Sequence, residues 1–344
     1  MVAASAALLV STMLTGCGEA GPPDRATPQQ PVATPSSVED LPTGRPTSFA
    51  LLSDGVLHVD GFSISTDADR LVHRGGTTLV GSVDEQHSRW WLVDGGRLEP
   101  LIDDATAYLV PVLSADGGTA AWRVDATVTK VDDTTSRYHW ELVVFDVPSR
   151  TVLGTTGLDG DVTCCDQGGL LMITGVTNDG RVGLSGGPAG NLSIWRAGDA
   201  LLPVKVRASS YSGFDPWPLG VSYVLAADPG ARVSFGRVDA AGVVTEVGWT
   251  RATAIWSADG RRVVDRVSSR STQTSRLEVS VPVTGATVPL ALPPAPDWQA
   301  LGWEDDGHVV AARVSTPDAG PPTYLAVVRC EAASGACERV HASA

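Results

Sequence analysis

Residues that could catalyse reactions or bind metals are few and widely spaced in this sequence. The histidines are His58, His73, His87, His139, His308 and His341. No two of them have metal-ligand spacing, and neither an H-E-x-x-H nor a C-x-x-C motif occurs. The segment "GLSGG", Gly183 to Gly187, matches G-x-S-x-G, but "PAGN" follows where a nucleophile elbow needs a helix. We therefore expect no catalytic role for Ser185, and the sequence identifies no catalytic, cofactor-binding or metal-ligating residue.

The first cysteine points to lipidation. Val2 to Leu14 is apolar and uncharged, which is typical of a signal peptide, and it is too short to span a bilayer. "LTGC", Leu14 to Cys17, resembles the bacterial lipobox, although no Lys or Arg precedes the apolar run. The resemblance implies a signal peptide over residues 1–16 and a diacylated Cys17 on the outer face of the cell membrane. The alternative is an ordinary cleaved signal with an incidental cysteine.

Two further pairs of cysteines could form disulfides in an exported protein. Cys330 and Cys337 flank "EAASGA", and a hairpin that pairs Glu331 with Ala336 would bring the two thiols together. We predict that disulfide. Cys164 and Cys165 are adjacent, so a bond between them would be strained. A vicinal disulfide or two buried thiols are expected there, with a redox or metal site as the alternative.

The composition of the chain argues against one class of binding partner and indicates a linker segment near the N-terminus. The net charge is −14, and an acidic surface argues against nucleic acid because phosphate contacts need clustered Lys and Arg. Residues 17–46 contain seven prolines and almost no large apolar side chains, which predicts a disordered tether between the membrane and the folded domain.

A repeated unit predicts the fold. "IWSADGRRVVDRV", from Ile255, places Asp-Gly between two apolar runs, as a tight hairpin turn requires. Similar units place a turn glycine at Gly76, Gly117, Gly180, Gly220, Gly260 and Gly307. A third and a fourth strand follow each hairpin, and we expect the glycines to supply positive φ angles. Six repeats of four strands indicate an all-β, six-bladed β-propeller.

The motif "WSADGRRVV" resembles the W-S-x-D-G-x-x-V/I unit of the six-bladed TolB-type propellers, and of actinobacterial propeller lipoproteins in particular. The resemblance covers about residues 47–344 and carries almost no information about function. The predicted blades span residues 67–104, 105–158, 159–208, 209–249, 250–296 and 297–344. Residues 47–66 are predicted to form a hairpin that pairs with the last blade and closes the ring. A defective seventh blade is the alternative.

Clustered carboxylates are mostly interpreted as solvated turn residues. They occur at Asp103-Asp104, Asp132-Asp133, Asp159-x-Asp161 and Glu304-Asp305-Asp306, and none has EF-hand spacing. No cofactor is expected from them. The alternative is Ca²⁺ in the central channel, held by acids of several blades, which would favour a lactonase-like hydrolase or a lyase.

The tryptophans Trp122, Trp256 and Trp303 are expected to pack between blades. The stiff segment "SSYSGFDPWPLG", from Ser209, is the predicted binding loop, with Tyr211, Phe214 and Trp217 as aromatic anchors. The alternative is that Trp217 and Phe214 face the core. The sequence as a whole favours a membrane-anchored binding module for an envelope protein or a small ligand. A propeller enzyme and a passive structural component of an envelope complex remain alternatives.

Overall fold

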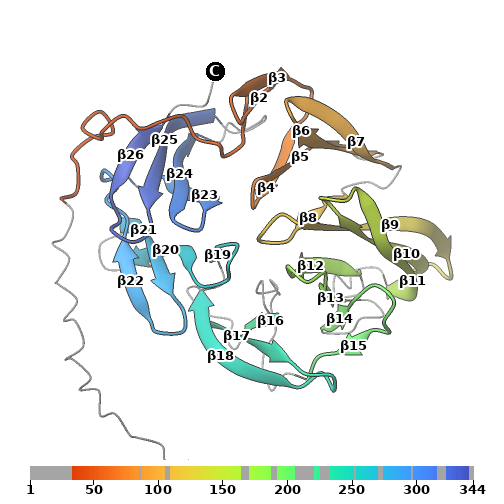
Figure 1. Ribbon diagram of the computed structural model, residues 1–344. Coiled ribbons are helices and arrows are strands. Elements are labelled where there is room, and N and C mark those ends of the chain that lie inside the picture. The colour runs from red at the N-terminus through yellow and green to blue at the C-terminus, as the bar shows by residue number, and fades with distance from the viewer. Residues whose placement is uncertain are drawn as a thin grey trace, which may run out of the picture. The chain divides into compact units, whose positions relative to one another are not determined.

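The computed structural model describes residues 33–84, 87–104, 109–163, 170–186, 192–205, 221–224, 232–251, 253–269, 274–295, 297–315 and 323–340. Every regular element among these residues is a β-strand, and the strands form antiparallel sheets arranged around a centre (Figure 1). The predicted all-β propeller is therefore confirmed. No helix in the described ranges is long and apolar enough to cross a membrane.

Six blades follow one another along the chain, and the first strand of each lies nearest the centre (Figure 1). The first blade contains β4 (Arg70–Arg74), β5 (Thr77–Val83), β6 (Ser88–Asp94) and β7 (Arg97–Asp104). The second contains β8 (Val112–Leu113), β9 (Thr119–Lys130), β10 (Thr135–Asp146) and β11 (Thr151–Thr163). The third contains β12 (Met172–Val176), β13 (Val182–Ser185), β14 (Ser193–Trp195) and β15 (Leu202–Pro203).

The fourth blade has three strands among the described residues: β16 (Val221–Val224), β17 (Arg232–Val238) and β18 (Val244–Arg251). The fifth contains β19 (Ile255–Trp256), β20 (Val263–Ser269), β21 (Thr274–Val281) and β22 (Ala286–Pro289). The sixth contains β23 (Trp298–Asp305), β24 (His308–Ser315), β25 (Thr323–Glu331) and β26 (Cys337–Val340).

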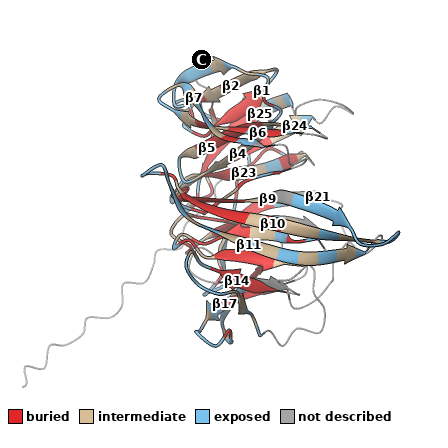
Figure 2. Cartoon of the chain, turned by 90° about the vertical axis from the view of Figure 1, so that its right-hand side faces the viewer, coloured by how far each residue is buried: buried red, intermediate tan, exposed pale blue. Residues whose placement is uncertain are grey.

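The second blade is longer than the sequence predicted. Its last strand, β11, ends at Thr163 and not near residue 158, because β10 pairs with β11 as far as Thr135 with Thr163. The polar insert at residues 125–137 lengthens β9 and β10 and contains the turn between them. Figure 2 shows these strands buried at one end and exposed at the other. The insert is therefore a projecting ribbon that continues the blade.

The repeated turn has a common hydrogen-bond pattern. Ser257 Oγ donates to Asp259 Oδ1 at 2.7 Å and accepts from the N–H of Arg262 at 3.1 Å. Ser114 with Asp116 repeats this arrangement in the second blade. The Ser-x-Asp-Gly motif is therefore explained by a hydroxyl that satisfies a carboxylate and a strand N–H at one turn.

The turn glycines are as expected at most described positions. The φ angles are +78° at Gly76, +72° at Gly117, +78° at Gly180 and +68° at Gly260. The expectation is wrong for Gly307, which has no positive φ. There the carboxylate of Asp305 accepts from the Gly307 N–H at 2.7 Å and stabilises a different turn.

Hydrogen bonds between blades join these turns. Asn178 of the third blade accepts from the N–H of Asp116 in the second at 3.3 Å, and donates to the carbonyl of Ala258 in the fifth at 2.8 Å. Asp306 of the sixth blade accepts from the N–H of Asp259 at 3.1 Å. The turns of the second, third, fifth and sixth blades are therefore linked to one another at the centre.

The ring is closed differently from the prediction. β1 (Leu51–Ser53), β2 (Val56–Val59) and β3 (Phe62–Ser65) form a separate three-stranded sheet, and no pairing of this sheet with the last blade is found among the described strands. Residues 42–44 instead bridge in parallel to β26, where the Gly44 N–H donates to the Arg339 carbonyl at 2.8 Å. Residues 41–44, which the sequence assigned to the tether, therefore belong to the folded domain, since Leu41 is buried in the core of the last two blades and Thr43 bridges to β26.

The N-terminal sheet lies between the last blade and the first. Phe49 and Leu51 pack with Val310 of the sixth blade, while Leu57 and Val59 share a cluster that includes Val80 of the first. Neighbouring blades thus cover β1 and β2, whereas β3 is mostly exposed. This matches the alternative of a partial seventh blade, added to the six predicted from the repeat.

The tryptophans expected between blades are buried there. Trp122, Trp256 and Trp303 are 7%, 6% and 6% exposed. The Trp303 indole N–H donates to the Ile255 carbonyl at 2.8 Å, from the sixth blade to the fifth. These side chains therefore support the ring and are not exposed as binding residues.

Candidate functional site

The candidate site begins with two acidic residues in the middle of the fifth blade. Strand pairing places Asp265 of β20 directly opposite Glu278 of β21. Asp265 is only 4% exposed and Glu278 only 8% exposed. Two carboxylates facing each other in this way destabilise a sheet unless a cation lies beside them.

Arg251 of the fourth blade supplies a cation across the boundary between blades. Its Nε lies 3.5 Å from Asp265 Oδ2, and its Nη1 lies 3.7 Å from Glu278 Oε1. Arg313 and Asp297 form a closer pair in the sixth blade, with nitrogen–oxygen distances of 3.0–3.1 Å. Arg251 therefore balances the charge without making close, bidentate hydrogen bonds to either acid.

The two oxygens of Asp265 have different surroundings. Oδ1 accepts from the N–H of Arg266 at 2.7 Å and from the hydroxyl of Thr253. Oδ2 is buried and has no hydrogen-bond partner among the described residues, although it lies within ion-pair distance of Arg251. A buried carboxylate oxygen without a donor is unusual, and it is a position where a ligand N–H could bind.

These side chains line a cavity of about 80 Å³ between the fourth and fifth blades. Trp249 of β18 borders it with Arg251, and Asp265, Glu278 and Thr287 border it from the fifth blade. Trp249 is 38% exposed, so part of an aromatic surface is accessible beside the acids. The arrangement can hold a small polar group between a tryptophan and two carboxylates.

A second polar cluster joins the N-terminal segment to the last blade. The buried carboxylate of Glu304 accepts from the Ser48 N–H at 2.6 Å and from the Thr47 hydroxyl at 2.9 Å. It also lies 3.3 Å from Arg329 Nη1, and both side chains are almost fully buried. Burial raises the pKa of Glu304, but these hydrogen bonds and Arg329 outweigh it and lower the pKa below its usual value. We assign this cluster to ring closure.

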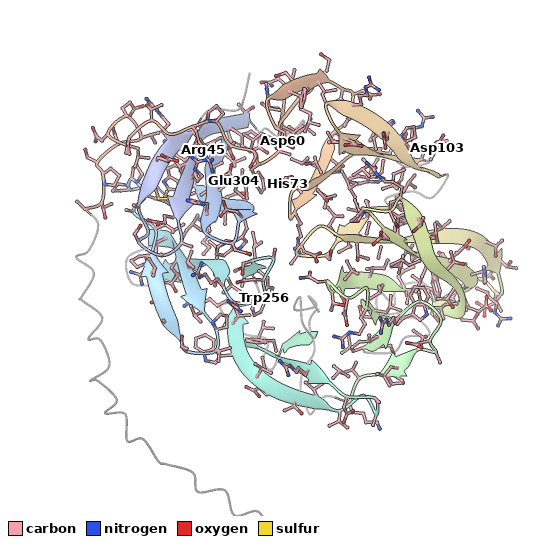
Figure 3. The ribbon with its side chains drawn as sticks, in the orientation of Figure 1. Arg45, Asp60, His73, Asp103, Trp256 and Glu304 are labelled. Atoms are coloured by element: carbon pink, nitrogen blue, oxygen red, sulfur yellow. A yellow bond between two sulfur atoms is a disulfide. The ribbon has the colours of Figure 1, made fainter. Side chains whose placement is uncertain are left out.

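Two titratable groups lie near Glu304 (Figure 3). His73 packs against Phe49 with ring centres 4.3 Å apart, and its Nδ1 lies 2.8 Å from Thr78 Oγ1. Burial lowers the pKa of His73 to about 4, although the charge of Glu304 acts in the opposite direction. Burial and the same charge raise the pKa of Asp60. Burial therefore shifts the protonation equilibria of both groups toward their neutral forms, relative to the exposed side chains.

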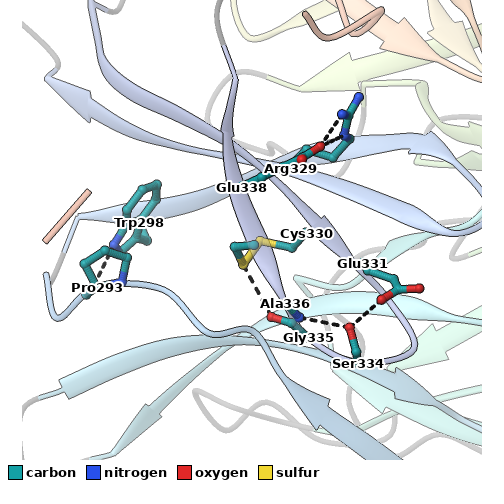
Figure 4. The surroundings of a disulfide bond; sticks show 10 residues. Pro293, Trp298, Arg329, Cys330, Glu331, Ser334, Gly335, Ala336 and Glu338 are labelled. Atoms are coloured by element: carbon teal, nitrogen blue, oxygen red, sulfur yellow. Dashed lines mark hydrogen bonds and ion pairs between the residues drawn. A yellow bond between two sulfur atoms is a disulfide. The ribbon is translucent and has the colours of Figure 1, made fainter. Parts of the chain in front are cut away.

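The expected disulfide is present between Cys330 and Cys337 (Figure 4). The N–H of Glu331 donates to the carbonyl of Ala336 at 2.8 Å, which is the hairpin pairing that the sequence suggested. The Cα atoms of the two cysteines are 4.0 Å apart. The bond therefore covalently joins the last two strands of the ring.

The other candidate residues from the sequence lie outside the described residues. They are Cys17, Cys164, Cys165, Tyr211, Phe214 and Trp217. The predictions for the lipid anchor, for the adjacent cysteines and for the aromatic loop therefore remain predictions.

The clustered acids have varied roles. Asp132 accepts from the N–H groups of Thr134 and Thr135 at 2.8 Å and so stabilises its own turn, as expected. Asp161 forms a bidentate pair with Arg137 at 2.7 and 2.9 Å. Glu304 differs from the expectation, because it is buried. Within the ranges that the structure describes, no group of three or more His, Cys, Asp or Glu residues could hold a metal ion.

Sequence reasoning missed the cavity residues Trp249, Arg251, Asp265 and Glu278. A signal was present, since "VVDRV" and "LEVSV" each place an acid inside a β-branched strand, where a charge needs a partner. The pairing of these two acids depends on the register of β20 and β21. The contribution of Arg251 depends on how the fourth and fifth blades pack. The spacing of residues along the sequence predicts neither the strand register nor the packing of the blades.

Comparisons with known proteins show likeness of fold. No family model matches the chain, and no curated protein matches it. Among similar solved structures, TolB from Acinetobacter baumannii is 12% identical, with 70% of this chain and 61% of TolB covered and a TM-score of 0.41. A eukaryotic initiation factor is 8% identical, with 92% of each chain covered and a TM-score of 0.42.

Dihydro-heme d1 dehydrogenase NirN is 18% identical, with 91% of this chain and 61% of NirN covered and a TM-score of 0.40. This chain thus spans about three fifths of TolB and of NirN. At these identities and scores the comparisons carry no argument about function. The assignment as a β-propeller therefore rests on the sheets of this chain itself.

Proposed function

We propose that this chain is a lipid-anchored extracytoplasmic β-propeller that binds an envelope protein or a small ligand at the cavity between the fourth and fifth blades. The observation that carries the proposal is the buried Asp265–Glu278 pair beside Trp249 and Arg251. Buried charges are costly, and they occur together where a specific interaction compensates for their desolvation.

The size of the cavity limits what it can hold. Pockets that enclose drug-sized ligands have volumes of roughly 300–1,000 Å³. The 80 Å³ here suits a single functional group. The site would therefore anchor one end of a larger ligand, or one side chain of a partner protein.

A photo-reactive residue at the cavity tests this function. Thr287 lines the cavity and is exposed, so p-benzoylphenylalanine at this position would lie beside a bound ligand. Irradiation of intact cells should give an adduct that Asp265→Asn abolishes. The matched control is the same residue at Val128, which is 53% exposed on the second blade. Equal adduct yields at Thr287 and Val128, or an adduct yield at Thr287 that Asp265→Asn does not change, would favour a passive structural role in an envelope complex.

The membrane anchor is a separate part of the proposal, and it rests on "LTGC". Two acyl chains on Cys17 would give stable attachment where one would be marginal. Cys17→Ser should release the protein from membranes, whereas Ser11→Ala in the same apolar segment should not. A Cys17→Ser protein that still sediments with carbonate-washed membranes would exclude the lipid anchor.

A further inference from the structure

We infer that the group bound in this cavity is cationic, a guanidinium or an alkylammonium, and that Arg251 occupies its place when no ligand is bound. The inference rests on the proposed function and names the chemistry of the ligand. The cavity holds two buried carboxylates opposite each other, and a group beside both of them gains most if it is positively charged.

Arg251 donates no hydrogen bond to one of the oxygens of Asp265, Oδ2. Arg251 remains 3.5 Å from Asp265 and 3.7 Å from Glu278, and Asp265 Oδ2 accepts no hydrogen bond among the described residues. Arg276 also approaches Glu278, at 3.3 Å, but its side chain is 65% exposed and solvent screens it. A ligand cation with several N–H donors can supply the hydrogen bond to Asp265 Oδ2 that Arg251 does not make.

Trp249 favours the same class of ligand. It borders the cavity beside both acids and is partly exposed. A tryptophan ring attracts cations through its quadrupole, most strongly where water is excluded. The net charge of −14 also favours the approach of a cation to the protein. An aromatic ring and two carboxylates together form a site for one desolvated cationic group.

The test compares probes of opposite charge on the full chain. Affinities of Nα-acetyl-arginine methylamide, Nα-acetyl-lysine methylamide, n-butylammonium chloride and Nα-acetyl-glutamate methylamide would be measured by saturation-transfer NMR titration. We expect the cationic probes to bind and the acidic probe not to bind. Tighter binding of the amino-acid probes than of n-butylammonium would identify a protein side chain as the ligand, and equal binding would identify a free amine.

Charge variants then separate a cation site from an anion site. Asp265→Asn should weaken binding of the cationic probe at least tenfold. Arg251→Met should strengthen it at least threefold, because the resident cation no longer competes. Should Asp265→Asn fail to fold, Glu278→Gln replaces it, and the direction of the Arg251→Met effect decides independently.

Three results would overturn the inference. Binding of the acidic probe that Arg251→Met abolishes would show an anion site, and the proposed binding function would stand. Absence of binding for every cationic probe, together with a Thr287 adduct that depends on Asp265, would also leave a binding site but exclude a cationic group. Absence of both the adduct and probe binding would refute the proposed function as well.

Discussion

The carboxylate of Glu304 accepts a hydrogen bond from the N–H of Ser48 at 2.6 Å and joins residues that are 256 positions apart in the sequence. The same carboxylate pairs with Arg329, so one buried charge connects the N-terminal segment, β23 and β25. The two ends of the propeller are therefore held together by a specific polar contact in addition to the parallel pairing of residues 42–44. A ring closed in this way keeps the blades, and the cavity between two of them, in fixed positions.

Removal of this charge should destabilise the fold strongly. Glu304→Ala leaves Arg329 buried with one partner fewer and should lower the free energy of unfolding by roughly 3–5 kcal/mol. Asp103→Ala is the control, because Asp103 pairs with Arg89 on the surface at 3.4 Å. Its cost should stay within about 0.5 kcal/mol. Urea unfolding measures both, and similar losses in the two variants would exclude the closing role of Glu304.

The repeated serine of the turn motif should contribute measurably to stability. Ser257→Ala removes a buried hydroxyl that donates to Asp259 and accepts from Arg262, so we expect a loss of about 1–3 kcal/mol. Thr284→Ala in the same blade is a suitable control, since that hydroxyl is exposed and its contacts are 3.3 and 3.5 Å long. Thermal unfolding that ranks Thr284→Ala as the more damaging change would contradict this account of the motif.

His73 should make stability depend on pH. Its pKa is about 4 in the folded state against an ordinary value of 6.5, because burial disfavours the charged ring. The unfolded chain therefore binds a proton first as the pH falls. The stability from the neutral ring is complete above pH 6.5 and is lost progressively between pH 6.5 and about 4. The loss should reach roughly 2–3 kcal/mol.

The variant His73→Asn keeps a polar group near Thr78 but cannot titrate in this range. Chemical unfolding at several pH values should show a weaker dependence for the variant between pH 6.5 and about 4. Glu304 is present in both proteins, so its own titration cancels in the difference. Parallel stability curves for the two proteins would show that His73 does not contribute.

The disulfide should stabilise the last two strands. Its cysteines are separated by seven positions, and the chain-entropy relation for so short a loop gives about 2–3 kcal/mol. The double variant Cys330→Ala/Cys337→Ala should therefore unfold at lower denaturant concentration than the parent. Reductant should lower the midpoint of the parent by more than that of the double variant, which retains only Cys164 and Cys165 in the folded domain. A midpoint that neither change affects would refute the contribution.

Local patterns in the sequence were sufficient to predict the strands and turns that make up the blades. The Ser-x-Asp-Gly unit around Ser257 specifies a turn through contacts within five residues, and the Cys330–Cys337 hairpin is equally local. These features depend on backbone rules that hold wherever the motif occurs. For this reason the strands follow the repeat, whereas the ends of β11 at Thr163 and of β18 at Arg251, beyond the predicted blade limits of 158 and 249, required their pairing registers.

Contacts between blades could not be predicted from local sequence patterns. Glu304 was interpreted as a turn residue because nothing near it in the sequence indicates Ser48. Arg251, Asp265 and Glu278 meet only after two strands pair in register and two blades pack together. The cavity is thus a property of the order of the sheets in space, and single-strand patterns do not contain that information.

The most direct test of the central claim, that the cavity between the fourth and fifth blades binds a ligand, is the ¹⁹F NMR spectrum of the protein labelled with 5-fluorotryptophan. The chain has ten tryptophans, and Trp249→Phe identifies the resonance of the one that borders the cavity. The account predicts that at least one of the cationic or acidic probes shifts the Trp249 resonance saturably, while the resonances of the buried Trp122 and Trp303 remain in place. A Trp249 resonance that no probe moves in the folded protein would contradict it.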